Sequence, residues 1–171
     1  SSAASDVYKR QGEKTINLIA DGTYNRGKTE PLDTQGTNAL IWALIALDSG
    51  DYEVPEDAYQ SREEILAELL KAQESDGGFS LSAGSGQTDV DITAMALTAL
   101  APYYEENSEA KTAADLALSW ISEHQESDGG FCSSMDTGTE SSESCAQVLT
   151  ALCSLGIDPQ SDSRFIKNGN T

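Results

Sequence analysis

The chain alternates apolar, alanine-rich segments with polar stretches, and the apolar segments recur at a nearly fixed distance. A block of five small and aliphatic residues stands at 43–47, returns at 96–100 and returns again at 148–152. The first step is 53 residues and the second is 52. Such a period is typical of a protein built from stacked copies of one helical unit. The chain therefore holds about three copies of that unit.

Each unit is expected to contain two kinds of helix. The first kind spans 37–47, 90–101 and 142–155 and is apolar on nearly every side, which is typical of a helix buried on most sides. The second kind is amphipathic and begins at a capping box, in which Ser61 precedes Glu64 by three positions. The apolar stripe of this helix is Ile65, Leu66, Leu69 and Leu70, and that of its counterpart is Ala114, Ala117, Leu118 and Ile121, with Trp120 on the flank. The contrast predicts an inner buried layer and an outer half-exposed layer.

A glycine turn closes each amphipathic helix. Residues 73–79 read Gln-Glu-Ser-Asp-Gly-Gly-Phe, and residues 125–131 repeat them without a change. Two successive glycines permit positive φ, which ends a helix and reverses the chain. The glutamine amides suit backbone groups at helix ends, and Phe79 and Phe131 are expected to pack between neighbouring hairpins. We interpret the turn as a structural element, since nothing in it is a reactive arrangement.

The two Gln-x-x-Asp-Gly-Gly-Phe turns resemble the QW-type repeats of terpenoid cyclases and protein prenyltransferases, with Phe in place of Trp. Segments 41–48 and 91–103 are most similar to the prenyltransferase-like repeat region of surface proteins from Gram-positive gut bacteria, and are also similar to the helical domain of vitamin B12 carriers. The resemblance implies an all-α fold, a partial α/α toroid of about three helical hairpins. It is specific for fold and weak for activity, because the same toroid serves enzymes, complement-type proteins and vitamin carriers.

The repeat register divides the chain into segments. We expect residues 1–11 to be a non-native tail, because they do not fit the repeat. Residues 12–171 are expected to be a fragment of a longer array without its terminal caps. Its segments are a partial unit at about 12–35, two units at 36–88 and 89–140, and a truncated unit at 141–171.

The charge balance is strongly acidic. The formal net charge is −19, from 29 acidic and 10 basic residues. It argues against nucleic acid and anionic membrane surfaces as partners. No run of residues is long and apolar enough to predict insertion into a membrane.

Two of the three cysteines change together along the repeat. Cys132 aligns with Ser80 of the preceding unit, and Cys145 aligns with Thr93. Paired replacement suggests contact, and hence a disulfide and an oxidising, extracellular or cell-surface location. Two buried thiols would explain the pattern equally well, and the sequence leaves both readings open.

The sharpest catalytic candidate is the segment 89–94, Asp-Val-Asp-Ile-Thr-Ala, which resembles the acidic motif with which some terpene cyclases protonate an alkene. Asp91 falls on the position of the proton donor, but Ile92 interrupts the motif at the next acid. The repeat register offers another reading. Asp89 aligns with Ser141 and Gly36, all N-cap residues, and the first-turn acid Asp91 aligns with Glu143 and Asn38. We therefore favour helix capping over catalysis, and we take Asn38, Asp91 and Glu143 as candidate ligand-binding positions.

Metal chemistry finds little support in the sequence. The single histidine, His124, lies beside the second turn, and Cys145 and Cys153 are two helical turns apart on the same face. These residues do not assemble the four ligands of a zinc site. We predict no metal and no cofactor.

These observations favour a non-catalytic module of an extracellular bacterial surface protein, which binds a ligand or partner or spaces other domains. By resemblance alone, the ligand would be a corrinoid-like small molecule held against a second domain. The alternative is an isoprenoid-processing enzyme, either a terpene cyclase or a prenyltransferase-like protein. Cyclase cavities need many aromatic faces to stabilise carbocations, and the chain has only 2 Trp, 6 Tyr and 3 Phe.

Overall fold

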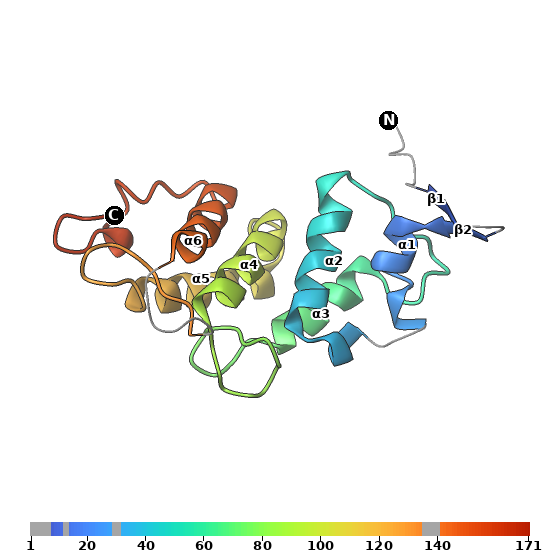
Figure 1. Cartoon of the computed structure of the whole chain (residues 1–171), viewed down its shortest axis with the longest axis horizontal. Helices are drawn as coiled ribbons and strands as arrows, with labels where there is room; N and C mark the ends of the chain where they lie inside the picture. The colour runs from blue at the N-terminus through green and yellow to red at the C-terminus, as the bar shows by residue number, and fades with distance from the viewer. Residues whose placement is uncertain (1–7, 12–13, 29–31, 135–140) are drawn as a thin grey trace. The chain divides into compact units, whose positions relative to one another are not determined.

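The computed structural model describes residues 8–11, 14–28, 32–134 and 141–171, and they form two compact units that meet in sequence between Leu69 and Leu70. Figure 1 shows the helices and strands in chain order. The first unit contains β1 (Tyr8–Gln11), β2 (Lys14–Asn17), α1 (Leu18–Gly22), the 3-10 helices η1 (Arg26–Lys28) and η2 (Leu32–Gln35), α2 (Thr37–Ser49) and most of α3 (Arg62–Lys71). The second contains α4 (Val90–Leu100), η3 (Ala101–Tyr103), α5 (Ser108–Glu123), α6 (Ser142–Ser154) and η4 (Ser163–Phe165). The described part of the chain is thus mainly helical, as the sequence predicts.

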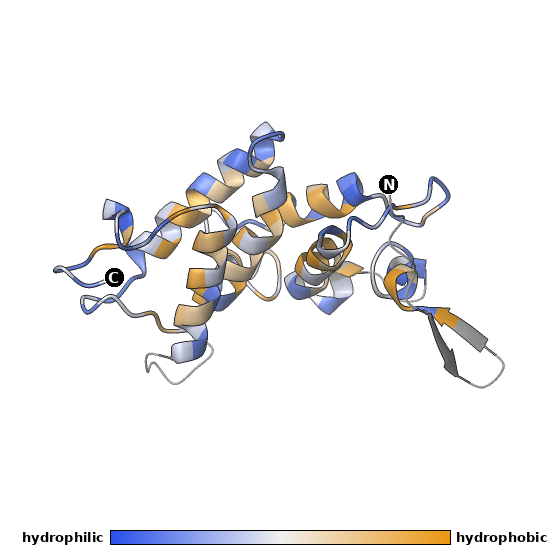
Figure 2. Cartoon of the chain, turned by 90° about the horizontal axis from the view of Figure 1, so that it is seen from above, coloured by the Kyte–Doolittle hydropathy of each residue, from blue (hydrophilic) through white to orange (hydrophobic). Residues whose placement is uncertain are grey.

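The apolar helices α2, α4 and α6 lie where the sequence places them, within two residues at each end. In the second unit α4 packs against both α5 and α6, so it lies at the centre of that unit's core. Hydrophobic residues run along the helices, while hydrophilic ones gather in loops and at helix ends (Figure 2). Helix α6 departs from the expectation of burial on most sides. Its residues at positions i, i+3, i+4 and i+7 are exposed in the described structure, namely Ala146, Leu149, Thr150 and Cys153.

The amphipathic helices confirm the predicted start signals. Ser61 Oγ accepts a hydrogen bond from the Glu64 backbone N–H at 3.1 Å, and Glu64 Oε2 accepts one from the Ser61 N–H at 2.8 Å. This is the reciprocal capping box that the sequence indicates. Helix α5 begins instead at Asn107, whose Oδ1 accepts from two first-turn N–H groups. Both helices bury one apolar stripe and expose the opposite face.

The described residues at 8–11 and 14–28 form a strand pair and one short helix, where the repeat register predicts a partial unit from about residue 12. Strands β1 and β2 form an antiparallel pair, and only the five residues of α1 are α-helical before the chain turns. The cause is local, because Asn17 caps α1 by accepting hydrogen bonds from the N–H groups of Ile19 and Ala20, both at 3.1 Å. A residue with extended backbone and a capping side chain starts a helix where a strand ends.

In the predicted truncated unit, residues 166–171 do not continue η4 as a helix. After η4 the chain makes a tight turn, in which the Lys167 N–H donates to Asn170 O at 2.7 Å and the Asn170 N–H donates to Lys167 O at 2.8 Å. The two central residues, Asn168 and Gly169, have φ of 51° and 82°. Two successive left-handed residues are typical of a type I′ turn and incompatible with a right-handed helix.

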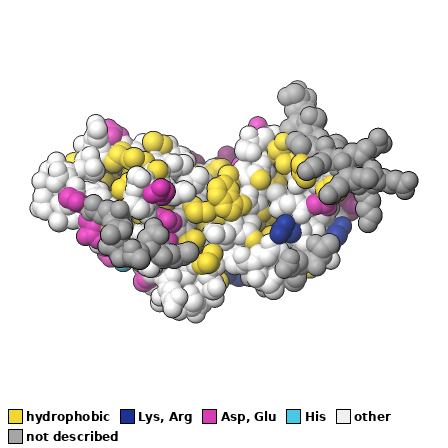
Figure 3. All heavy atoms as spheres, viewed as in Figure 1, with side chains coloured by type: hydrophobic (Ala, Val, Ile, Leu, Met, Phe, Trp, Pro, Cys, Tyr) yellow, Lys and Arg dark blue, Asp and Glu magenta, His cyan; other side chains and the backbone are white. Residues whose placement is uncertain are grey.

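Acidic side chains are spread over the face of the molecule shown in Figure 3, with few basic ones between them. Within the described residues, no helix combines the length and the apolar character that crossing a membrane requires.

Candidate functional site

The two glycine turns have the same hydrogen-bond geometry. In the first, the Glu74 N–H donates to Gly78 O and the Gly77 N–H donates to Glu74 O, both at 2.9 Å. In the second, the matching bonds join Glu126 to Gly130 at 2.9 Å and Gly129 to Glu126 at 3.0 Å. The first glycine of each pair, Gly77 or Gly129, has φ of 93° or 96°, which only glycine adopts without strain. The turns are therefore one structural element used twice, as predicted.

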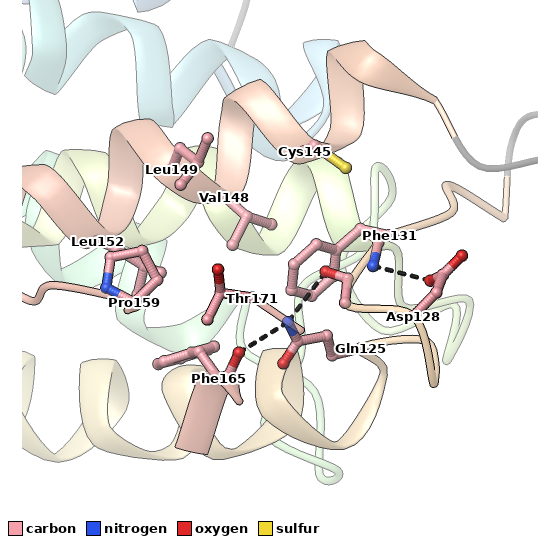
Figure 4. A pocket seen from close by; sticks show the side chains of 12 residues that line it. Gln125, Asp128, Phe131, Cys145, Val148, Leu149, Leu152, Pro159, Phe165 and Thr171 are labelled. Carbon is pink, nitrogen blue, oxygen red and sulfur yellow. Dashed lines mark hydrogen bonds between the residues drawn. The ribbon is translucent and has the colours of Figure 1, made fainter. Parts of the chain in front are cut away.

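The glutamine of each turn ties it to a segment 40 residues further along the chain. Gln73 Nε2 donates to Gly77 O at 2.9 Å and to Ala113 O at 2.8 Å. Gln125 Nε2 donates to Gly129 O at 2.9 Å and to Phe165 O at 3.0 Å, as the dashed lines in Figure 4 show. Ala113 lies inside α5, so this amide reaches a mid-helix carbonyl and not the helix end that the sequence suggested.

The aspartate of the first turn accepts a hydrogen bond from a tryptophan on the outer helix α5. Asp76 Oδ1 accepts from the Gly78 N–H at 3.0 Å, while its Oδ2 accepts from Thr88 Oγ1 at 2.8 Å and from Trp120 Nε1 at 3.0 Å. Partial burial raises the pKa of Asp76, but these hydrogen bonds outweigh it and hold the pKa below its ordinary value. Trp120 is 3% exposed and stacks on His124, with ring centroids 3.7 Å apart. The sequence places Trp120 on the flank of its helix and carries no sign of its partner 44 positions earlier.

The first residue of the acidic segment, Asp89, is a buried N-cap. Its Oδ2 accepts from the backbone N–H groups of Asp91 at 2.9 Å and Ile92 at 3.2 Å, which confirms the predicted capping role. Its Oδ1 accepts from Ser133 Oγ at 2.6 Å and from the N–H and Oγ of Ser134 at 2.8 and 3.0 Å. The sequence predicted the first set of bonds and missed the second, because nothing in the repeat marks Ser133 and Ser134 as partners.

These bonds decide the charge of Asp89. Burial raises the pKa of its carboxyl group, but hydrogen bonds from Ser133, Ser134 and the helix N–H groups outweigh it and leave the pKa below its ordinary value. The carboxylate is therefore an anion at neutral pH. Two elements depend on it, namely the start of α4 and the chain that leaves the second turn.

The three candidate ligand-binding residues each lie in the first turn of an apolar helix. Asp91 is half-buried on α4, Glu143 is exposed on α6 and accepts from Ser142 Oγ at 3.2 Å, and Asn38 is half-buried on α2. The Oδ1 atom of Asn38 is buried and accepts no hydrogen bond from the described residues. Because α4 and α6 pack together, Asp91 and Glu143 belong to neighbouring helices of one unit. Asn38 holds the matching position in the other unit.

The cysteines are thiols in the structure, so the disulfide suggested between Cys132 and Cys145 is not formed in it. Cys132 and Cys145 are half-buried, and Cys153 is exposed. Among the described residues, no three His, Cys, Asp or Glu side chains come together in a group that could hold a metal ion.

A cavity of about 250 Å³ lies between α6 and the second turn (Figure 4). The turn contributes Gln125, Asp128, Gly129, Gly130 and Phe131. Helix α6 contributes Cys145, Val148, Leu149 and Leu152, and the C-terminal segment contributes Pro159, Phe165 and Thr171. The cavity was not foreseen from the sequence, because its walls depend on the path of residues 159–171.

Buried helices inside, amphipathic helices outside and repeated glycine turns define a helical repeat domain of the α/α-toroid class. A family model described as the prenyltransferase alpha-alpha toroid domain matches residues 3–169, and the chain belongs to this family. A search of curated proteins finds no match.

Proposed function

We propose that the chain is part of a non-catalytic toroid domain of an extracellular bacterial surface protein, which binds a small molecule or an adjacent domain of the same protein. The observation that carries the proposal is the use of the acidic segment as a helix cap. A cyclase that protonates an alkene needs a carboxylic acid kept in its protonated form. Here Asp89 is held as an anion by hydrogen-bond donors, and Asp91 stands in a first turn, where the helix dipole favours negative charge. Both acidic side chains thus act at the start of α4, as helix-capping and first-turn residues.

The proposed binding face begins at the first turns of α4 and α6 and runs along both helices. Asp91, Met95 and Thr98 lie at i, i+4 and i+7 of α4, so they share one face, and all three are half-buried. Glu143, Gln147 and Thr150 occupy the matching positions of α6, 52 residues later. Two packed helices therefore present related faces that mix carboxylate, amide, hydroxyl and thioether groups. Such a surface suits a ligand with several polar atoms better than it suits a carbocation, which needs aromatic rings.

The resemblance to vitamin B12 carriers makes a corrinoid the first ligand to test. Equilibrium dialysis against cyanocobalamin would measure binding to the wild type and to the double variant Asp91→Ala/Glu143→Ala. We expect the double variant to bind at least about tenfold more weakly, the effect of losing one or two hydrogen bonds to charged groups. The control is Glu105→Ala/Glu106→Ala, which removes two exposed acids outside this face.

The isoprenoid-enzyme alternative is tested on the same proteins. Each would be incubated with squalene and with geranylgeranyl diphosphate, and the extracts analysed for cyclised or transferred products. We expect no conversion. Product formation by the wild type that disappears in Asp91→Asn would replace the binding proposal with the enzyme one.

A further inference from the structure

Helix α2 begins without the side-chain cap that α4 and α6 possess. At α4 the Asp89 carboxylate accepts from two first-turn N–H groups, and at α6 the Ser141 hydroxyl accepts from one. The repeat register places Gly36 at this position of α2, where no side chain accepts a hydrogen bond. Within the described part of the chain, the N–H groups of Thr37 and Asn38 therefore have no acceptor. Unpaired N–H groups and the positive end of the helix dipole together attract anions.

A buried hydroxyl lies beside these N–H groups and is also unpaired. Thr37 is 1% exposed, and its Oγ1 makes no hydrogen bond to any residue that the structure describes. Because Oγ1 is bonded to Cβ, it lies within about 4 Å of the Thr37 backbone nitrogen in every staggered rotamer. The matching residue of α4 is Val90, which fills a similarly buried position with methyl groups alone. A buried hydroxyl without a partner is destabilising, which indicates that a water, an ion or a ligand completes the site.

The residue before Gly36 supplies a second unpaired donor and a link to a cation. Gln35 Oε1 accepts from Arg26 Nε at 2.7 Å, which fixes the orientation of the side-chain amide. Its Nε2 is buried and donates to no described residue. The first turn of α2 contains no acidic residue, in contrast to the first turns of α4 and α6. In a chain of net charge −19, the start of α2 thus combines unpaired donors with a nearby guanidinium group.

We propose that the start of α2 binds a carboxylate group, which accepts from the N–H groups of Thr37 and Asn38, the Thr37 hydroxyl and the Gln35 amide. The second unit already holds a carboxylate in this way, because Asp89 accepts from two N–H groups of α4 and from two serine hydroxyls. The Asn38 side-chain amide can also donate, since a half-turn about its last bond exchanges Oδ1 and Nδ2. Gln35, Gly36 and Asn38 are half-buried, so a ligand reaches the helix start from solvent.

The carboxylate can belong to a small organic acid or to an acidic side chain of a peptide. All residues of the site lie in the first unit, and none belongs to the face formed by α4 and α6. The site therefore does not depend on the function proposed above.

Amide NMR spectroscopy observes this site directly and provides an internal control. Sodium acetate replaces sodium chloride at constant pH and ionic strength in a solution of the ¹⁵N-labelled protein. We expect saturable shifts of the Thr37 and Asn38 amide resonances, with a dissociation constant on the order of 1 mM for so small a ligand. The amides of Asp91 and Ile92 already donate to Asp89, so their resonances should not move.

Two substitutions test the donors. Thr37→Val removes the hydroxyl and copies Val90 of α4, so acetate should bind about five- to tenfold more weakly. The melting temperature without ligand should stay the same or rise, because the variant removes an unpaired buried group. A lower melting temperature together with unchanged acetate affinity would assign the hydroxyl to the core and overturn its role in binding.

The second substitution, Gln35→Glu, keeps the acceptor for Arg26 and replaces the amide donor with a negative charge. We expect acetate to bind at least about tenfold more weakly. The control is Gln160→Glu, which adds the same charge at an exposed residue of the second unit and should leave the affinity unchanged. Thermal melting shows whether each variant is folded. Equal losses of affinity in the two glutamate variants would mean that acetate responds only to net charge, which would refute the site.

A second arm separates the two sources of the carboxylate. The peptide acetyl-Gly-Asp-Gly-amide presents one side-chain carboxylate between blocked ends. Saturable shifts at Thr37 and Asn38 with acetate and not with the peptide assign the site to a small acid. Shifts at the same amides with the peptide assign it to an acidic side chain. Absence of saturable shifts with both probes, or equal shifts at the starts of α2 and α4, refutes the proposal.

Discussion

The indole nitrogen of Trp120 lies 3.0 Å from Asp76 Oδ2, across 44 residues of sequence. This bond fastens α5 to the first glycine turn, and its donor, Trp120, is buried. We predict that Trp120→Phe, which keeps most of the ring and removes the donor, destabilises the protein by about 1 to 3 kcal/mol. Urea denaturation followed by circular dichroism would measure the change.

The matched control for this substitution is Trp42→Phe, because Trp42 is 53% exposed. Exposed substitutions usually change stability by less than about 0.5 kcal/mol. Equal losses in the two variants would show that the hydrogen bond to Asp76 contributes nothing beyond the ring itself.

The phenylalanine that ends each turn is the second test. Phe79 is fully buried and Phe131 is 5% exposed, and Phe131 also lines the cavity. We predict that Phe79→Ala costs about 3 to 5 kcal/mol, since truncation of a buried aromatic residue leaves a void as well as losing apolar contact. Phe131→Ala should fall at the low end of this range, because one side of its ring already faces a cavity. An unchanged melting midpoint for Phe79→Ala would contradict the role of this residue in the core.

The repeat made these features predictable. A seven-residue identity fixes the register, and the register gave the ends of α2, α4 and α6, the turn geometry and the burial of both phenylalanines. The contacts that the register could not supply join parts of the chain that differ between units. Asp89 reaches Ser133 and Ser134, for which no periodic signal exists, and the cavity depends on a non-helical C-terminal segment. Asn17 and the Asn168–Gly169 pair override the register through local capping and turn chemistry.

The pH dependence of stability should show the ionised state of Asp89. Its folded-state pKa lies below the unfolded value of about 3.9. The folded protein therefore binds fewer protons than the unfolded chain at low pH. The stability contributed by Asp89 is complete above the unfolded pKa and is lost as the pH falls through the folded pKa.

Asp89→Asn removes this contribution, so we predict a loss of about 1 to 3 kcal/mol at pH 7 and a smaller further loss between pH 5 and about pH 2 than in the wild type. Denaturant titrations across this range would compare the two slopes. Asp76, Asp115 and Asp162 also have lowered pKa values. They are common to both proteins, so their effect cancels in the difference. Parallel curves for the two proteins would mean that the pKa of Asp89 does not differ between the folded and unfolded states.

The last prediction concerns Asp91, on which the choice between a helix-start acid and a catalytic acid depends. Asp91→Asn should change stability by less than about 0.5 kcal/mol, since Asn38 already holds the matching position of α2 and the first-turn N–H groups of α4 are capped by Asp89. Chemical denaturation at pH 7 would measure it, with Asp89→Asn as the contrasting variant in the same turn. A loss of more than about 1 kcal/mol would show that Asp91 makes specific charge-dependent contacts beyond the helix start. A gain in stability would instead favour the catalytic role of Asp91. Removal of a strained buried charge stabilises a fold, and such strain is typical of active sites. The small effect that we expect, together with the large one at Asp89, would assign the acidic segment to helix capping.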